Sequence, residues 1–231
     1  MVFVDFEKAF DSIDQELLWK NLRHYGVPEK IARMIRVFYD GFQARFLHEG
    51  EMTGSFSMNT GVRQGCLLSP LLFLMEVDWV SRQAFDDNKT GIQFTLLQKL
   101  DDLDFADDMV LLSRKITHMR QKFVALIEQA ARVGLKINAS KTKEMRIRSP
   151  ANTGNINFVG EVLEQVLAFT YLGSLITTTC STGEDVEARC RNAQVAFSSH
   201  CKNHMEIKCH LTVDKHKDLQ FQREVRPPIR I

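Results

Sequence analysis

The sequence predicts an α+β fold in which helices back a mostly antiparallel sheet. Three observations lead to this prediction. The chain has 231 residues, 44% hydrophobic and 26% charged, which is enough to bury a sizeable core without disulfides or metals. Several segments space their apolar residues at helical intervals and have capping residues at their ends. Between them lie short apolar runs separated by turn residues, a pattern typical of hairpins.

The N-terminal segment is expected to form a strand followed by two helices. Val2–Asp5 is a β-type run. Ser12, with Gln15 three residues later, is typical of a capping box that opens a helix, and Gly26 ends that helix. Pro28 suits the first position of a second helix. An apolar stripe at helical spacing follows in it: Ile31, Met34, Ile35 and Phe38.

The remaining elements are predicted from the same apolar periodicities. The expected strands are Gln43–His48 and Ser55–Thr60 as a hairpin, Ile92–Gln98, two strands within Leu103–Ser113 joined at Asp107-Asp108, Leu135–Asn138, Lys143–Arg148, Phe158–Val159 and Phe169–Thr177. The expected helices are Ser69–Phe85, opened by the cap pair Ser69-Pro70, then Ile116–Val133 and Glu184–Ser199. Residues 1–178 are expected to form the main domain, and 179–231 a helix with a poorly defined tail.

Composition excludes several classes of protein. No apolar run reaches the length of about 18 residues that spans a membrane, and the N-terminus lacks the features of a signal peptide. The five cysteines are an odd number, which favours reduced thiols inside the cell. We therefore expect an intracellular protein of the nucleus or cytoplasm, neither secreted nor associated with a membrane.

Charges of opposite sign are segregated along the chain. Residues 86–108 carry seven aspartates against two lysines, whereas residues 114–148 carry ten lysines and arginines against two glutamates. Such segregation suits a protein that holds cations in one place and polyanions next to it. Two solvated faces would give the same pattern, and charge alone favours that interpretation.

Two adjacent aspartates, Asp107 and Asp108, stand between apolar runs. Strand signals on both sides place the pair in a tight hairpin turn. Like charges this close repel, so the pair is tolerated only when it is exposed or binds cations. A plain turn that contains Asp-Asp explains the pair equally well. Asp5, at the end of the first strand, is a second rigidly held carboxylate.

Carboxylates on two elements that converge on a pair of hard cations would support phosphoryl transfer. One ion lowers the pKa of the attacking hydroxyl, and the other stabilises the leaving pyrophosphate. Two Mg²⁺ ions fit because Mg²⁺ prefers a few carboxylates with water and substrate phosphates, and Mn²⁺ is a possible substitute. An EF-hand at Asp102 and Asp104 is excluded, since the loop glycine and the terminal glutamate are missing at the required offsets.

A glycine-bounded loop, Gly61-Val-Arg-Gln-Gly65, precedes the helix expected at Ser69. Glycines let the backbone approach a ligand closely, and a helix N-terminus favours anions. Arg63 and Gln64 add hydrogen-bond donors. A simple loop is the alternative interpretation.

Taken together, these pieces form four motifs in a fixed order. They are Phe3-Val-Asp-Phe-Glu-Lys-Ala-Phe-Asp11, Gly61-Val-Arg-Gln-Gly-Cys-Leu-Leu-Ser-Pro70, Phe105-Ala-Asp-Asp108 and Gly134-Leu-Lys-Ile-Asn-Ala-Ser-Lys-Thr-Lys143. With them the chain resembles the reverse transcriptase of non-LTR (LINE-type) retrotransposons, from residue 2 to about residue 199. The resemblance implies a right-hand polymerase palm with truncated fingers and, in residues 179–231, the start of a thumb-like helical region.

The resemblance also implies an activity, RNA-directed DNA polymerisation with an RNA template, a DNA primer and dNTPs. Asp5, Asp107 and Asp108 match the catalytic aspartates that bind the metal ions. Phe10 matches the aromatic residue that rejects a ribose 2′-hydroxyl and so selects dNTPs.

Further residues match by the same resemblance. Gln64 and Gly65 match the loop that contacts the incoming nucleotide and template. Lys141 matches a lysine near the triphosphate, a candidate proton donor to pyrophosphate. The residues that match the support of the primer end are Tyr171, Leu172 and Gly173.

Two alternatives accompany this interpretation. A viral RNA-dependent RNA polymerase shares the palm, but it usually has glycine where Ala106 stands and lacks a bulky residue at Phe10. The family also has a fingers region before the first motif, whereas this sequence begins two residues before it. A catalytically weak or inactive retroelement remnant that only binds nucleic acid is therefore the second alternative.

A zinc knuckle is faintly suggested near the C-terminus by Cys201, His204 and Cys209, with Cys190 as a fourth ligand. The spacing does not match a standard zinc finger.

Overall fold

A computed structural model describes residues 1–231 except 42, 86–89, 96–98, 148–153, 159 and 204–231. The chain divides into two compact units, Met1–Ala188 and Arg189–Ile231. Mixed helices and antiparallel strands confirm the predicted α+β class. The functional division predicted between residues 178 and 179 stays a prediction.

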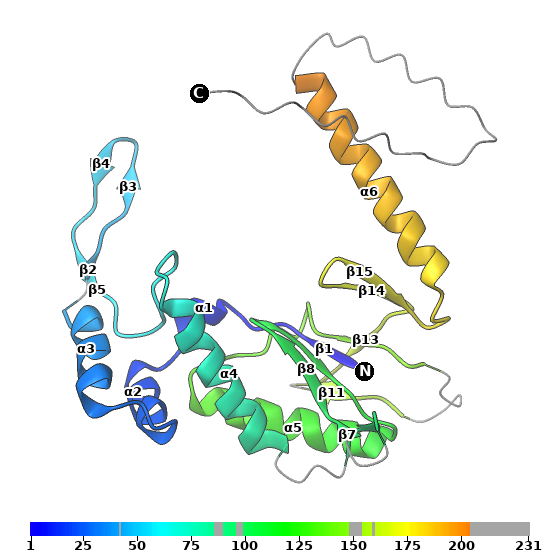
Figure 1. Cartoon of the computed structure of the whole chain (residues 1–231), viewed down its shortest axis with the longest axis horizontal. Coiled ribbons are helices and arrows are strands. Elements are labelled where there is room, and N and C mark those ends of the chain that lie inside the picture. The colour runs from blue at the N-terminus through cyan, green and yellow to red at the C-terminus, as the bar shows by residue number, and fades with distance from the viewer. Residues whose placement is uncertain (42, 86–89, 96–98, 148–153, 159, 204–231) are drawn as a thin grey trace, which may run out of the picture. The chain divides into compact units, whose positions relative to one another are not determined.

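The centre of the first unit is a five-stranded sheet in the order β13-β10-β1-β9-β8. Its strands are β1 (Val2–Val4), β8 (Asp102–Phe105), β9 (Asp108–Leu111), β10 (Lys143–Glu144) and β13 (Glu164–Gln165). β1 is antiparallel to both of its neighbours, β9 and β10, and β8 is antiparallel to β9 (Figure 1). The first strand of the chain therefore lies in the middle of the sheet.

Side chains alternate between the two faces of this sheet. One face, called here the helix face, points into the main hydrophobic core. Its strand residues include Val2, Val4, Met109 and Leu111. The other face, called the hairpin face, carries a smaller hydrophobic cluster. That cluster includes Phe3, Val110, Leu112 and Met145.

Four helices bury apolar side chains in the main core: α2 (Gln15–His24), α3 (Glu29–Tyr39), α4 (Ser69–Phe85) and α5 (Ile116–Arg132). α4 and α5 pack against each other (Figure 1), and each contributes a fully buried ring to the core, Phe73 from α4 and Phe123 from α5. The helices predicted from Ser69 and from Ile116 are confirmed. α1 (Ala9–Ser12) is a single short turn between β1 and α2.

The cap of α2 differs from the prediction. The side chain of Asp14 accepts a hydrogen bond from Leu17 N at 2.9 Å and caps the helix. Ser12 Oγ instead donates to the main-chain oxygens of Glu7 and Ala9. The capping box expected at Ser12 is therefore wrong, because the acceptor nearer to the helix start takes its place.

α3 (Glu29–Tyr39) follows and begins one residue after Pro28. Of its predicted stripe only Ile35 is buried, whereas Ile31, Met34 and Phe38 are 48%, 55% and 63% exposed. The helix buries Ala32, Ile35 and Tyr39 instead. Apolar periodicity thus indicates the helix correctly but not which side of it meets α2.

Five two-stranded sheets complete the described part of the first unit. They are β2 (Gln43–Ala44) with β5 (Phe56–Ser57), β3 (Leu47–His48) with β4 (Glu51–Met52), β6 (Ile92–Gln93) with β7 (Lys99–Leu100), β11 (Asn157–Phe158) with β12 (Glu161–Val162), and β14 (Ala168–Tyr171) with β15 (Ser174–Thr177). α6 (Thr182–Asn203) follows. None of the helices in the described ranges is long and apolar enough to span a membrane. Cys66, Cys180 and Cys190 are free thiols.

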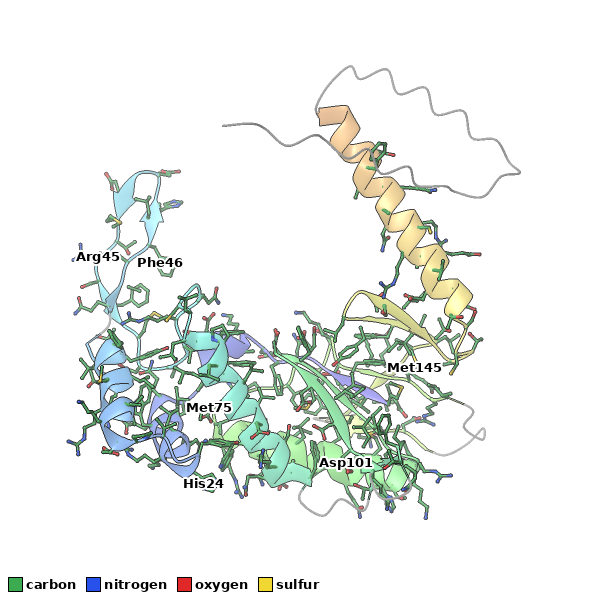
Figure 2. The ribbon with its side chains drawn as sticks, in the orientation of Figure 1. His24, Arg45, Phe46, Met75, Asp101 and Met145 are labelled. Atoms are coloured by element: carbon green, nitrogen blue, oxygen red, sulfur yellow. The ribbon has the colours of Figure 1, made fainter. Side chains whose placement is uncertain are left out.

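A buried ion pair joins the acidic and basic segments of the sequence. Nζ of Lys122, on α5, lies 2.5 Å from Oδ1 of Asp101, and the two side chains are only 4% and 6% exposed (Figure 2). The ammonium group also donates to the main-chain oxygens of Asp101 and Leu112. Burial lowers the pKa of Lys122, and Asp101 only partly offsets this effect. Part of the segregated charge is therefore neutralised inside the fold.

Candidate active site

Asp5 and Asp108 stand opposite each other at the end of two adjacent strands. The register of β1 and β9 pairs Val4 with Met109, so the next pair along the strands is Asp5 with Asp108. By the alternation of side chains, both aspartates lie on the hairpin face with Phe3. The fold thus brings together two carboxylates that are far apart in the sequence.

The second predicted aspartate, Asp107, lies in the turn beside them. β8 and β9 are joined by Ala106 and Asp107, since Phe105 pairs with Asp108. Ala106 adopts a left-handed φ of 55°, which a tight turn requires at this position. The predicted hairpin is confirmed, with its turn one residue earlier than Asp107-Asp108.

These three carboxylates interact electrostatically. Burial raises the pKa of Asp108, and the charges of Asp107 and Asp5 raise it further. Oδ2 of Asp5 is buried and accepts no hydrogen bond. A divalent cation would relieve the repulsion between these carboxylates, so the residues fit a divalent ion.

The three aspartates do not form a closed metal cage. Within the part of the chain that the structure describes, no group of three or more His, Cys, Asp or Glu side chains is arranged to hold a metal ion. An open set of carboxylates is the arrangement in which water and substrate phosphates complete the coordination of Mg²⁺.

Two other aspartates of the acidic segment belong to the opposite face. The register of β8 places Asp102 and Asp104 on the helix face, where Ser81 Oγ donates to Asp104 Oδ2 at 3.0 Å. Burial and the neighbouring Asp102 raise the pKa of Asp104 to about 7, and burial also raises the pKa of Asp102. Of the aspartates of the acidic segment that the structure describes, only Asp107 and Asp108 lie at the site.

Lys141 approaches Asp5 from the loop that follows α5. Its Nζ lies 3.4 Å from Oδ2 of Asp5. The loop is fixed on the main chain of the same aspartate, because Asn138 N donates to Asp5 O at 2.8 Å and Asp5 N donates to Thr142 Oγ1 at 3.4 Å. Thr142 is fully buried and was missed by the sequence analysis, since a threonine between two lysines gives no signal.

Phe10 lies against the glycine-bounded loop. Its ring stacks on Phe73 with centroids 4.5 Å apart, and its main-chain oxygen accepts from Val62 N at 2.6 Å. A Cβ at Gly61 would lie 2.7 Å from main-chain atoms of Phe10 and Asp11, so the close approach requires glycine. The first two sequence motifs are therefore in direct contact.

The same loop is held by two further side chains. Gln64 Nε2 donates to Asp11 Oδ1 at 3.1 Å, and Gln15 Nε2 donates to Gly61 O at 3.0 Å. Gly65 has a φ of 80° and open space around its α-carbon. Sequence analysis missed Asp11 and Gln15, although the position of Asp11 directly after Phe10 could have pointed to it.

The predicted primer-support residues lie at the tip of the β14–β15 hairpin. Leu172 and Gly173 form its turn, with φ of 48° and 77°. The hydroxyl of Tyr171 lies 3.1 Å from Leu103 O and 3.3 Å from Asp108 O. Burial and the charges of nearby aspartates raise the pKa of Tyr171, so its hydroxyl stays protonated and donates.

The suggested zinc ligands are not brought together by any described contact. Cys190 is exposed on α6. The side chain of Cys201, and all of His204 and Cys209, lie outside the described residues. The zinc site stays a prediction.

Comparison with known proteins identifies the family. Residues 1–176 match the family model described as reverse transcriptase (RNA-dependent DNA polymerase). The chain is 27% identical over 199 residues to the Retrovirus-related Pol polyprotein from type-2 retrotransposable element R2DM of Drosophila melanogaster, a match that covers 79% of this chain and 18% of that protein. It is 25% identical over 141 residues to the Pol polyprotein from type-1 retrotransposable element R2 of Popillia japonica, covering 61% of this chain and 23% of that protein.

Solved structures with a similar fold include two telomerases. The apo telomerase of Candida tropicalis superposes with a TM-score of 0.56 at 15% identity, covering 78% of this chain and 34% of that chain. The telomerase of Candida albicans, solved in complex with a fragment of telomeric RNA, gives a TM-score of 0.54 at 14% identity, covering 78% and 29%. At these identities the likeness concerns the fold alone.

Proposed function

The chain belongs to the reverse transcriptase family, and from that premise we propose that it is the catalytic palm of an RNA-directed DNA polymerase of a retrotransposon. In this proposal it joins dNTPs to the 3′ end of a DNA primer on an RNA template. The observation that carries the proposal is the pair Asp5 and Asp108, opposite each other on one face of the sheet, with Lys141 at 3.4 Å from Asp5.

Asp5, Asp107 and Asp108 are proposed to hold two Mg²⁺ ions, with Mn²⁺ as a substitute. Bound there, the ions would lower the pKa of the primer hydroxyl and neutralise charge on the pyrophosphate that leaves. Lys141 is a general acid in this scheme, because its ammonium group can give a proton to pyrophosphate close to the same aspartates. The side chain of Lys141 is 66% exposed, which leaves room for a substrate.

Nucleotide selection is assigned to Phe10. Its ring is held by the stack on Phe73, so it cannot easily turn aside for a ribose 2′-hydroxyl. Gln64 and Gly65 present a side-chain amide and an open stretch of backbone to the incoming nucleotide and template.

Nucleic-acid partners follow from the family and are supported by the telomerase fold, one example of which was solved with RNA. The primer end is assigned to the turn Tyr171-Leu172-Gly173, on the same face as the aspartates. Copying of RNA into DNA places the protein inside the cell, in the nucleus or cytoplasm, as part of this proposal.

Extension of oligo(dT) on poly(rA) tests the activity. We expect incorporation of dTTP by the wild-type chain, dependent on Mg²⁺ or Mn²⁺, and its loss in Asp107→Ala, whose exposed side chain contributes nothing to the core. Asp40→Ala, at the end of α3, is the matched control and keeps wild-type incorporation.

The second candidate function is nucleic-acid binding without polymerisation. The chain spans 18% and 23% of the length of the first two relatives. A remnant that only binds nucleic acid would show salt-sensitive RNA binding without incorporation. That result would replace the polymerase by the binding function.

A further inference from the structure

We propose that Tyr171 is a positioning residue for the metal-binding carboxylates, because its hydroxyl ties the tip of the β14–β15 hairpin to the main chain of Asp108. The inference rests on the proposed function, and it gives the hydroxyl of Tyr171 a task distinct from support of the primer end.

The β14–β15 hairpin is attached to the central sheet at its base, at its middle and at its tip. Among the described strands, β14 pairs only with β15, so no strand ladder joins this hairpin to the five-stranded sheet. At the base, Val166 N donates to Glu144 O at 2.8 Å. At the middle, the ring of Phe169 stacks on that of Phe3 with centroids 4.0 Å apart. The tip is held by Tyr171.

The hydroxyl of Tyr171 bonds main-chain oxygens, and both acceptors belong to the hairpin that carries the aspartates. It lies 3.1 Å from Leu103 O on β8 and 3.3 Å from Asp108 O on β9. A phenol has one proton, so the two carbonyls share it in alternation. This contact therefore links β8, β9 and β14 at a single atom.

Such a contact acts on the carboxylate through the backbone. The peptide that follows Asp108 contains the accepted oxygen, and its orientation sets the direction in which the Asp108 side chain leaves the strand. Asp108 faces Asp5 across the β1–β9 pair, so a small rotation of that peptide changes the spacing of the two carboxylates. Displacements of about 1 Å in a catalytic group reduce rates by up to about a hundred-fold.

Tyr171→Phe separates the hydroxyl from the ring. The variant keeps the ring that packs with Phe3, at 6.1 Å between centroids, and removes only the two hydrogen bonds. Tyr25→Phe is the matched control, because the hydroxyl of Tyr25 donates to the side chain of Asp78 on α4 and not to a main-chain oxygen of either hairpin.

Two measurements test the proposal. Binding of Mn²⁺ is titrated by the electron paramagnetic resonance signal of the free ion, which requires no turnover. We expect Tyr171→Phe to weaken Mn²⁺ binding about three- to ten-fold, with Tyr25→Phe unchanged. In single-turnover extension, the maximal rate falls about ten-fold, and the Kd for template–primer stays within about two-fold of wild type.

The outcomes are distinguishable. Equal Mn²⁺ binding by Tyr171→Phe and wild type overturns the positioning role, as does a loss confined to template–primer affinity. Wild-type Mn²⁺ binding without incorporation overturns the polymerase, and the Mn²⁺ titration of Tyr171→Phe still decides the positioning role. A wild-type chain that binds no more Mn²⁺ than Asp107→Ala overturns both.

Discussion

Nζ of Lys141 lies 3.4 Å from Oδ2 of Asp5, and the loop that carries the lysine is hydrogen-bonded to the main chain of the same aspartate. The cation and the carboxylate are therefore fixed to each other through the backbone. An ion pair whose side chains are 66% and 36% exposed contributes little to stability, about 0–1 kcal/mol, so its position is better explained by chemistry.

Lys141→Arg tests whether Lys141 gives up a proton. Arginine keeps the positive charge but does not deprotonate in proteins. We expect the single-turnover rate of dNTP incorporation to fall at least roughly ten-fold, with the Kd for dNTP changed less than about three-fold. Lys20→Arg, at an exposed lysine on α2, is the matched control. A wild-type rate in Lys141→Arg would exclude proton donation by Lys141 and leave only the contribution of its positive charge.

Phe10→Val tests sugar selection. Because the smaller side chain opens space beside Phe73, we expect the preference for dATP over ATP on a poly(rU) template to fall roughly ten-fold or more. The measurement is the ratio of kcat/KM for the two nucleotides. Phe46→Val, in the exposed β2–β5 region, is the control. An unchanged ratio would show that another group contacts the sugar.

Gly134→Ala tests a close contact between the fourth motif and α1. Gly134 has a φ of 85°, and a Cβ there would lie 2.3 Å from Ser12 O. Gly160 has the same φ with nothing within 4 Å, which makes Gly160→Ala the control. We expect Gly160→Ala to lower the free energy of unfolding by about 1 kcal/mol, and Gly134→Ala by about 3 kcal/mol or more. Urea denaturation measures both, and equal losses would mean that the contact with Ser12 relaxes freely.

Glu76 is expected to make stability fall with rising pH. It is fully buried on α4, its Oε2 accepts from Asn21 Nδ2 at 2.8 Å, and burial raises its pKa to about 7 from 4.5. Between these values the folded state keeps the proton and the unfolded state loses it, so the free energy of unfolding decreases as pH rises from about 4.5 to about 7.

Glu76→Gln removes this dependence. We expect the variant to match wild type near pH 5 and to be more stable by roughly 2–3 kcal/mol at pH 8. Urea denaturation at several pH values measures the difference. Glu16→Gln, whose side chain is 67% exposed, should run parallel to wild type at every pH. A Glu76→Gln curve that is also parallel to wild type would show that Glu76 is charged in the folded protein.

Local patterns predicted most of the elements but not how they face one another. The hairpin at Asp107-Asp108 and the long helices from Ser69 and Ile116 follow from alternation and from 3.6-residue spacing. The cap of α2 was misplaced from Asp14 to Ser12, because both residue types cap helices and only one residue separates them. Which of the two residues caps the helix depends on where the backbone turns into the helix.

The acidic segment shows that sequence alone does not give the surroundings of each side chain in the fold. Asp101, Asp104 and Asp108 look alike as members of one charged run. In the fold, Asp101 pairs with a buried lysine, Asp104 faces Ser81, and Asp108 faces Asp5. The environment that each aspartate enters depends on the face of the strand to which it points and on the strand register, and tertiary structure sets both. The four motifs predicted the site because they identify particular residues in a fixed order. Composition gives only the number of residues of each type.

Because β1 is short and central, the active site should tolerate substitutions in it better than insertions or deletions. Val2–Val4 lies in the middle of the sheet, and each step along it reverses the side to which a side chain turns. Exchanging one valine for isoleucine preserves that parity. Inserting or deleting a single codon would rotate Asp5 toward α4 and α5 and bury a carboxylate among hydrocarbon. The spacing within this strand is therefore under stricter constraint than the identity of its residues.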